Sequence, residues 1–147
     1  MRRGFTLIEL LVVISIIGVL IGLSMFGLQG ARESARDARR KADLEQIRSG
    51  VEIYKSDCNG YPIKTPAGML EDNLMGKGTP SSCAVTNTYI TKTPEDPVSP
   101  NQSYLYYSAD GITYEICASL EGGGTVQTCG GSSSCGGLGC NYKVTSP

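Results

Sequence analysis

The chain begins with a long run of hydrophobic residues. Between residues 5 and 28 the sequence contains a single charged residue, Glu9. At about 1.5 Å of rise per residue, a helix of this length spans the ~30 Å hydrocarbon layer of a membrane. We therefore expect residues 5–28 to form a membrane helix.

Residues 29–57 continue with helix-forming residues of mixed polarity. Opposite charges lie four positions apart, Asp37 with Lys41 and Arg39 with Asp43, which suits a helix face in water. Small or apolar residues recur at three- and four-residue spacing, and we expect them to share the other face: Ala31, Ala35, Ala38, Ala42, Leu44, Ile47, Val51 and Tyr54. Together the two stretches predict one helix over residues 5–56, roughly 75 to 80 Å long.

The helix pattern ends just after Asp57. Asn59 precedes a glycine, a pair that favours a turn, and Pro62 disfavours helical geometry at the residue before it. We expect a long irregular connection from there to about residue 100, interrupted by a short helix at residues 69–75.

Two strands are predicted in the second half of the chain. Residues 104–108 and 113–120 are expected as strands joined by a turn at residues 109–111, which predicts a β-hairpin. The tyrosines of the first strand are expected to supply its faces and the core. Residues 141–144 predict a further strand at the sheet edge.

Six cysteines lie in the polar part of the chain, three of them inside or beside a Gly- and Ser-rich stretch at residues 122–139. The sequence has no Cys-x-x-Cys pair and no histidine to complete a zinc site. An even number of cysteines with this composition predicts disulfides formed in an oxidising compartment. We expect Cys58 to join Cys83 and the later four to pair among themselves, in an order left open: Cys117, Cys129, Cys135 and Cys140.

Composition narrows the function classes. The 147 residues suit one small domain with one appendage, and 13 basic residues against 14 acidic ones give a formal net charge of -1. This balance gives no general reason to expect nucleic acid, which stays open as a partner. The absence of histidine removes the commonest general base, so we expect no enzyme, no metal and no cofactor. Residues 101–103 match the N-glycosylation pattern, which indicates only an exposed loop.

The residues at the start of the chain carry the most specific signal. Arg2-Arg3-Gly4-Phe5-Thr6-Leu7-Ile8-Glu9-Leu10-Leu11 closely resembles the prepilin motif of type IV pilins and type II secretion pseudopilins. The resemblance implies cleavage between Gly4 and Phe5 by a prepilin peptidase, N-methylation of Phe5, and a role for Glu9 in assembly. It also implies a helical homopolymer of identical subunits, built on an inner-membrane assembly platform.

The same resemblance implies an α+β chain with the type IV pilin fold. In that fold a long N-terminal helix, its hydrophobic half protruding, packs on a small antiparallel sheet with disulfide-stapled C-terminal loops. The implied segments are a leader at residues 1–4, a hydrophobic helix at 5–28, an amphipathic helix at 29–57 and a head at 58–147.

Glu9 is also unusual on physical grounds alone. A carboxylate inside an apolar membrane helix costs on the order of 2.5 kcal/mol or more unless it finds a partner. Cleavage after Gly4 would create a free amine at Phe5, at similar depth, available to a neighbouring subunit. We expect this pairing to hold an incoming subunit in register.

The hydrophobic run also contains glycines. Gly18 and Gly22 form a Gly-x-x-x-Gly pair, which in lipid is often a helix-packing face. Each glycine also weakens the helix by about 1 kcal/mol relative to alanine. The resemblance implies that this stretch unwinds within the filament, where many members have proline and this chain has Phe26 and Gly27. We favour a softened segment at Gly18, Gly22 and Gly27.

Other interpretations of the N-terminal run are a plain membrane anchor or a secretory signal peptide. A signal peptide requires a purely apolar centre and a small-x-small cleavage site near its end, whereas Glu9 stands at the start of this run. A plain anchor explains the length but not the residues from Gly4 to Glu9. An anchored enzyme lacks any nucleophile motif.

The function we expect first is a major pilin of a type IV pilus, stored in the inner membrane and assembled into an extracellular fibre for adhesion, twitching motility or DNA uptake. The alternatives are the major pseudopilin of a type II secretion system, and a competence or minor pilin. The pseudopilins resemble this chain at residues 96–97 and 107–111, but they typically bind calcium in a late acidic loop and have few cysteines. After Leu120 this chain has only Glu121 as an acid, which disfavours such a site.

Overall fold

A computed structural model describes residues 4–147, so the expected leader residues Arg2 and Arg3 lie outside the described part. Within that part the chain forms one helix and six strands, with these bounds: α1 (Leu7–Cys58), β1 (Lys64–Gly68), β2 (Leu74–Met75), β3 (Thr88–Ile90), β4 (Leu105–Ser108), β5 (Glu115–Ala118) and β6 (Tyr142–Thr145). The chain divides into two units, Met1–Ala35 and Arg36–Pro147, and each is described by itself.

The first unit, from residue 4 onward, is a short non-helical start followed by the apolar part of α1. Its large apolar side chains from Leu7 to Met25 are exposed, as is Leu28, because a single helix has nothing to bury them against. The sequence prediction of one unbroken helix across the apolar and amphipathic stretches is confirmed, since α1 runs for 52 residues.

In the second unit α1 buries one stripe of side chains at helical spacing. Leu44, Ile47, Val51, Tyr54 and Cys58 are all buried, with three- and four-residue intervals between them. The helix ends where expected: Asn59 follows it with a φ of 58°, a left-handed conformation that asparagine tolerates at helix C-termini.

The expected continuation of this stripe through the alanines is wrong. Ala38 and Ala42 are exposed, as are Ala31 and Ala35 in the first unit, so the alanines do not share the core face. Arg40 takes the position instead, four residues before Leu44, and its side chain is fully buried. The pattern misled because a paired arginine can occupy a core position that a search for apolar residues assigns to alanine.

One of the two expected charge pairs on α1 also differs. Arg39 does lie near Asp43, at 3.9 Å. Asp37, however, pairs with Arg40 three residues on, at 2.7 Å, and Lys41 lies over the ring of Tyr142. The buried guanidinium competes for Asp37 better than an exposed ammonium does.

A four-stranded antiparallel sheet packs on α1, in the order β1-β4-β5-β6. The expected hairpin is β4–β5, with Leu105 opposite Cys117 and Tyr107 opposite Glu115. The expected edge strand is β6, paired with β5. β1 was not anticipated, because Pro66 and Gly68 disfavour a strand; it lies at the opposite edge, where the sheet tolerates them.

The helix expected at residues 69–75 is wrong. The segment contains β2, which pairs with β3 as a separate two-stranded ribbon, Leu74 lying opposite Ile90. Leu70 and Leu74 are both buried, and their four-residue spacing imitates a helix. Gly76, directly after β2, lets the chain pass close to the segment before β3: a Cβ on it would lie 2.1 Å from the carbonyl oxygen of Ala84, so only glycine fits there.

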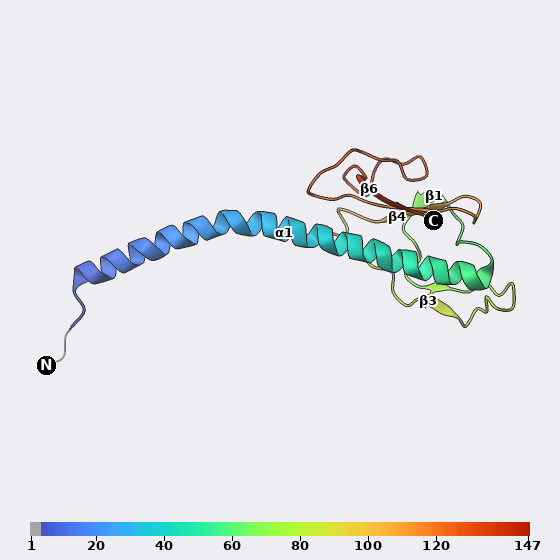
Figure 1. Ribbon diagram of the computed structural model, residues 1–147, viewed down its shortest axis with the longest axis horizontal. Coiled ribbons are helices and arrows are strands. Elements are labelled where there is room, and N and C mark those ends of the chain that lie inside the picture. The colour runs from blue at the N-terminus through green and yellow to red at the C-terminus, as the bar shows by residue number, and fades with distance from the viewer. Residues whose placement is uncertain (1–3) are drawn as a thin grey trace. The chain divides into compact units, whose positions relative to one another are not determined.

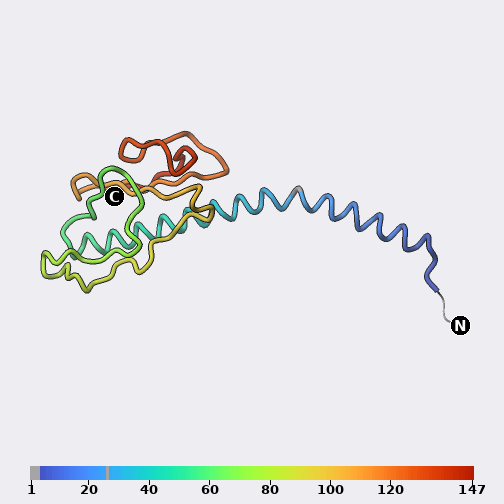
Figure 2. Tube along the Cα trace, turned by 180° about the vertical axis from the view of Figure 1, so that it is seen from behind, coloured from blue at the N-terminus to red at the C-terminus, as the bar shows by residue number. Residues whose placement is uncertain are grey.

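In the second unit α1 lies between the sheet and the β2–β3 ribbon (Figure 1). Alternate residues of the sheet face opposite sides. Tyr106 and Ile116 join the core with α1, whereas Leu105 and Cys117 join a smaller cluster with three other cysteines. The segment after β5, coloured orange to red, covers that second side (Figure 2). The head therefore has two cores, one on each face of the sheet.

Candidate functional site

The apolar part of α1 is the first candidate feature. Within the described residues, α1 is the one helix long and apolar enough to cross a membrane, by length and composition. None of its apolar window is buried by the rest of the chain. Such a surface requires lipid or other helices to cover it.

The start of this helix is built by two side chains that bond to each other. The backbone N–H and the hydroxyl of Thr6 donate to Glu9 Oε2 at 2.9 and 2.7 Å, and the Glu9 N–H donates to Thr6 Oγ1 at 3.4 Å. This is a capping box, which satisfies backbone donors that the first helical turn leaves free. The sequence argument missed it, although Thr-x-x-Glu before an apolar run is its signature.

Gly4 and Phe5 precede the helix in non-helical conformation. Phe5 is 86% exposed, and a Cβ built on Gly4 would meet nothing within 4 Å. The peptide bond between them is therefore open on all sides within the described residues.

The three glycines expected to soften the helix lie within continuous α-helix. Gly18, Gly22 and Gly27 are all helical, and a Cβ on any of them would meet no other atom within 4 Å. No neighbour within the described chain requires glycine at these positions. Unwinding within a filament stays a prediction.

A cluster of ionic side chains links α1 to two loops of the head. We call it the ion cluster: Arg36, Asp37, Arg40, Asp96 and Glu121. Arg40 donates to Asp96 at 2.8 and 3.2 Å and to Asp37 at 2.7 Å, and its Nη2 lies 2.9 Å from Glu121 Oε1. Arg36 donates to both oxygens of Glu121. Three carboxylates thus surround one buried guanidinium.

The pKa shifts of Glu121, Arg40 and Asp37 favour the charged forms of these three side chains. Hydrogen bonds from Arg36, reinforced by Arg40, lower the pKa of Glu121 to about 2. Burial alone would lower the pKa of Arg40, but hydrogen bonds to Asp96, Asp37 and Glu121 raise it above its ordinary value. Burial likewise opposes the shift at Asp37, whose pKa is nevertheless lowered by the backbone N–H groups that it accepts.

Those backbone donors belong to the start of the C-terminal loop. The N–H groups of Glu121 and Gly122 donate to the two oxygens of Asp37, at 2.9 and 2.8 Å. Asn141 closes the other end of the loop by accepting from the Leu120 N–H and donating to its carbonyl. Sequence patterns gave no signal for this cluster, because its members are up to 85 residues apart.

All six cysteines are paired. The structure joins Cys58 to Cys83, the pair named from the sequence, and pairs the later four as Cys117–Cys129 and Cys135–Cys140. The first disulfide ties the end of α1 to the segment before β3. The other two form most of the second core, where all four sulfur-bearing residues are fully buried.

Comparison with known proteins matches two families along the chain. Residues 1–25 match the prokaryotic N-terminal methylation motif, and residues 28–133 match the type II secretion system (T2SS), protein G. No solved structure matches the chain.

Several relatives carry the name type II secretion system core protein G. The protein from Escherichia coli (strain K12) is 36% identical over 98 residues, covering 65% of this chain and 66% of the relative. The protein from Pectobacterium carotovorum subsp. carotovorum is 37% identical over 100 residues, covering 65% and 62%. The one from Aeromonas hydrophila is 37% identical over 100 residues, covering 65% and 67%. This chain thus spans about two thirds of the length of these relatives.

The matched family is one of structural subunits and not of enzymes, and the exposed apolar helix of this chain suits such a subunit. Because the second match covers well over half of the chain and follows directly on the methylation motif, this chain belongs to the type II secretion system protein G family, within the type IV pilins and pseudopilins.

Proposed function

We propose that this chain is the major pseudopilin of a type II secretion system, a subunit that polymerises into a short periplasmic fibre that helps to push folded proteins out of the cell. The observation that carries the proposal is the protein G match over residues 28–133. The sequence alone led us to expect a pilus subunit first and a pseudopilin second. The relatives named above favour the second function.

The first step of the proposed function is removal of residues 1–4. The bond between Gly4 and Phe5 lies in non-helical backbone, two residues before α1 begins. A prepilin peptidase therefore reaches it without unwinding a helix. Cleavage leaves a free amine on Phe5, and N-methylation keeps that amine positively charged at neutral pH.

Glu9 is the proposed partner of that amine in an adjoining subunit. Thr6 holds Glu9 Oε2 by two hydrogen bonds, while Oε1 accepts none from residues 4–147. One carboxylate oxygen thus fixes the side chain and the other is free for a cation. Because a charge in the membrane is costly, the pairing stabilises an assembled subunit relative to an isolated one.

The exposed apolar helix gives the subunit two states. In the membrane, lipid covers the side chains from Leu7 to Leu28, and in a fibre the helices of identical subunits cover them. An assembly platform in the inner membrane would move subunits from the first state to the second.

The type IV pilus shaft remains a second candidate, because of one observation. The loop from Gly122 to Cys140 contains no Asp or Glu and is held by disulfides, whereas the resemblance to pseudopilins implies an acidic calcium loop there. The missing acidic residues are what keep the pilus open as a candidate, because disulfides in this loop are compatible with either kind of fibre.

Deletion of the gene separates the two functions. If the chain is a pseudopilin, cells that lack it should keep in the periplasm the folded proteins that they normally secrete. Their long surface fibres should be unchanged in number. Re-expression of the full chain should restore secretion. Normal secretion together with loss of long surface fibres would instead assign the chain to a pilus.

A further inference from the structure

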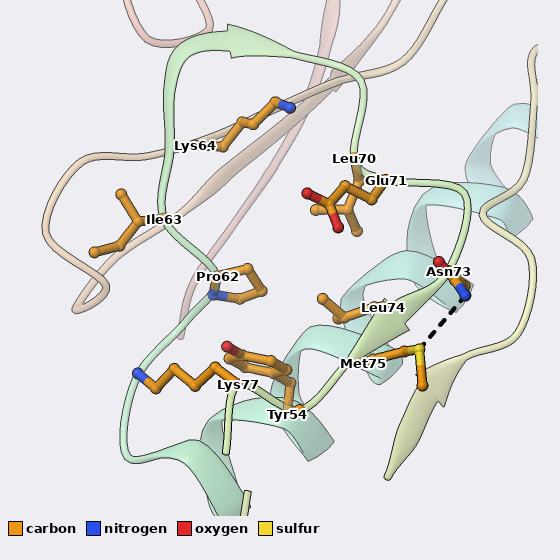
Figure 3. Close-up of a pocket in the computed structure, with 11 residues that line it drawn as sticks. Tyr54, Pro62, Ile63, Lys64, Leu70, Glu71, Asn73, Leu74, Met75 and Lys77 are labelled. Atoms are coloured by element: carbon orange, nitrogen blue, oxygen red, sulfur yellow. Dashed lines mark hydrogen bonds between the residues drawn. The ribbon is translucent and has the colours of Figure 1, made fainter. Parts of the chain in front are cut away.

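Among the exposed apolar side chains of the head, two pairs mark separate places on its surface. The first is a pocket of about 360 Å³ near the end of α1 (Figure 3). Its lining includes the buried side chains of Tyr54, Leu70 and Leu74. Ile63 and Met75 stand at its rim, 67% and 42% exposed. Ile63 and Met75 thus leave apolar surface uncovered beside a pocket whose lining is otherwise mixed in polarity.

Charged groups flank this pocket without closing it. Residues 62–77 form much of the pocket's lining, and Lys64 and Glu71 lie on opposite arms of the loop that these residues make (Figure 3). Lys77 also belongs to the lining. Neither lysine forms an ion pair with any residue that the structure describes. Their ammonium groups are therefore free to donate to an occupant that brings carbonyl or hydroxyl oxygens.

The second place is the C-terminal loop, residues 122–140. Val126 is 68% exposed and Leu138 is 52% exposed. The loop brings them close, because a Cβ on Gly139, the residue after Leu138, would lie 3.4 Å from a methyl group of Val126. The whole loop carries no charged residue.

The loop is also rigidly held. Cys117–Cys129 fastens it to β5, and Cys135–Cys140 closes a small ring around Leu138. Gly136 adopts a φ of 78° and packs directly on Gln102, where a Cβ would lie 2.8 Å from the Cα atom. A surface fixed in advance loses little conformational entropy on binding.

The two places lie at opposite ends of the head along α1. The loop begins at Gly122, bonded to Asp37, whereas the pocket contains Tyr54. At 1.5 Å of rise per residue these positions are about 25 Å apart along the helix axis. Two different surfaces at opposite ends, repeated in every copy, are what an open fibre requires.

We propose that Val126 and Leu138 of one copy seat in the Ile63–Met75 pocket of the next copy along the fibre. This contact rests on the proposed polymerisation and adds a head-to-head surface to it. The uncharged loop places no unpaired charge in the pocket, and its backbone carbonyls and serine hydroxyls supply acceptors for Lys64 and Lys77.

Photocrosslinking tests the contact in intact cells. A benzoylphenylalanine replaces Leu138 in the full chain, and the fibres are irradiated, digested and sequenced. We expect cross-linked dimers that join the loop peptide to residues 62–77. A second probe at Val126 should give the same target. A probe at Ile53, exposed on α1 and outside both surfaces, should not reach it.

A charge introduced into the loop by mutation provides an independent readout. Leu138→Lys should lose most of the fibres, because it brings a third ammonium group to Lys64 and Lys77, whereas Leu138→Met should keep them. Fibres whose loop probes cross-link only to other segments, or Leu138→Lys fibres of normal number, would overturn the contact alone. Wild-type cells without any fibre of this protein would overturn the proposed function and the contact with it.

Discussion

Arg40 and Asp96 form a two-contact ion pair in which neither side chain is appreciably exposed. Arg40 Nε and Nη2 donate to the two oxygens of Asp96 at 2.8 and 3.2 Å, across 56 residues of sequence. Asp96 Oδ1 also accepts the N–H of Val98, which fixes the turn that carries the carboxylate. The pair therefore fastens the loop before β4 to the first turns of α1 in the head.

Removal of the guanidinium should destabilise the head strongly. Arg40→Met leaves Asp37, Asp96 and Glu121 without their shared cation, and breaking a buried pair in this way costs about 3 to 5 kcal/mol. Arg40→Lys should cost less, because it keeps the charge but not the two-contact geometry. Thermal unfolding of the full chain in detergent would show this order. Equal stability of Arg40→Met and wild type would contradict a structural role for the cluster.

The stability of the head should depend on pH through Glu121. Its pKa is lowered from 4.5 to about 2, so the ionised form is favoured in the folded state. The stabilisation is therefore complete above pH 4.5 and is lost as the pH falls towards 2. In Glu121→Gln the decline over this window should be shallower, though still present, because the pKa of Asp37 is also lowered. Unfolding curves measured from pH 6 to pH 2 would separate the two profiles, and parallel declines would argue against the assignment.

Local signals predicted the parts of the fold that depend on neighbouring residues. The long helix, its end just before Asn59, the β4–β5 hairpin and the edge strand β6 all follow from periodicity and turn residues. The prediction failed where contacts with residues far away in the sequence determine the secondary structure. The four-residue spacing of Leu70 and Leu74 cannot distinguish a helix from a strand whose partner lies at residues 88–90.

Prediction of the candidate site also succeeded for neighbouring residues and failed for distant ones. The motif from Gly4 to Glu9 is contiguous, so the sequence was enough to select it. Arg40 was overlooked because its buried position depends on Asp96 and Glu121, which are brought close only by the folded loops. The alanines were assigned to the core for the same reason: without those partners, a small residue is the safer choice for a buried helix face.

The two C-terminal disulfides should control the loop that they enclose. Peptide mapping without reduction should find Cys58–Cys83, Cys117–Cys129 and Cys135–Cys140, and no free thiol. A double Cys117→Ala, Cys129→Ala variant removes the fastening to β5 and should make residues 122–140 sensitive to limited proteolysis, while α1 and the other sheet face stay protected. A Cys58→Ala, Cys83→Ala variant is the control and should leave the loop protected. A loop equally resistant in all three proteins would show that other contacts hold it.

Glu9 can be tested separately as a helix cap and as a charge. Glu9→Gln keeps an oxygen that accepts from Thr6, so the start of the helix should survive, but the negative charge is lost. Glu9→Leu removes both. We expect each variant to accumulate in the membrane with complete disulfides, and each to form few or no fibres. Fibre counts by electron microscopy, without a wild-type copy present, measure the effect; normal fibres from Glu9→Gln would mean that the cap, and not the charge, is what assembly needs.

The central claim is that this chain is a processed subunit of a fibre, joined through its N-terminal amine. The most direct measurement is the intact mass of subunits recovered from purified fibres, followed by sequencing of the N-terminal peptide. The account predicts loss of residues 1–4 and one added methyl group, located on Phe5. Assembled subunits that still begin at Met1 would contradict it, because the amine that Glu9 is proposed to bind would not exist.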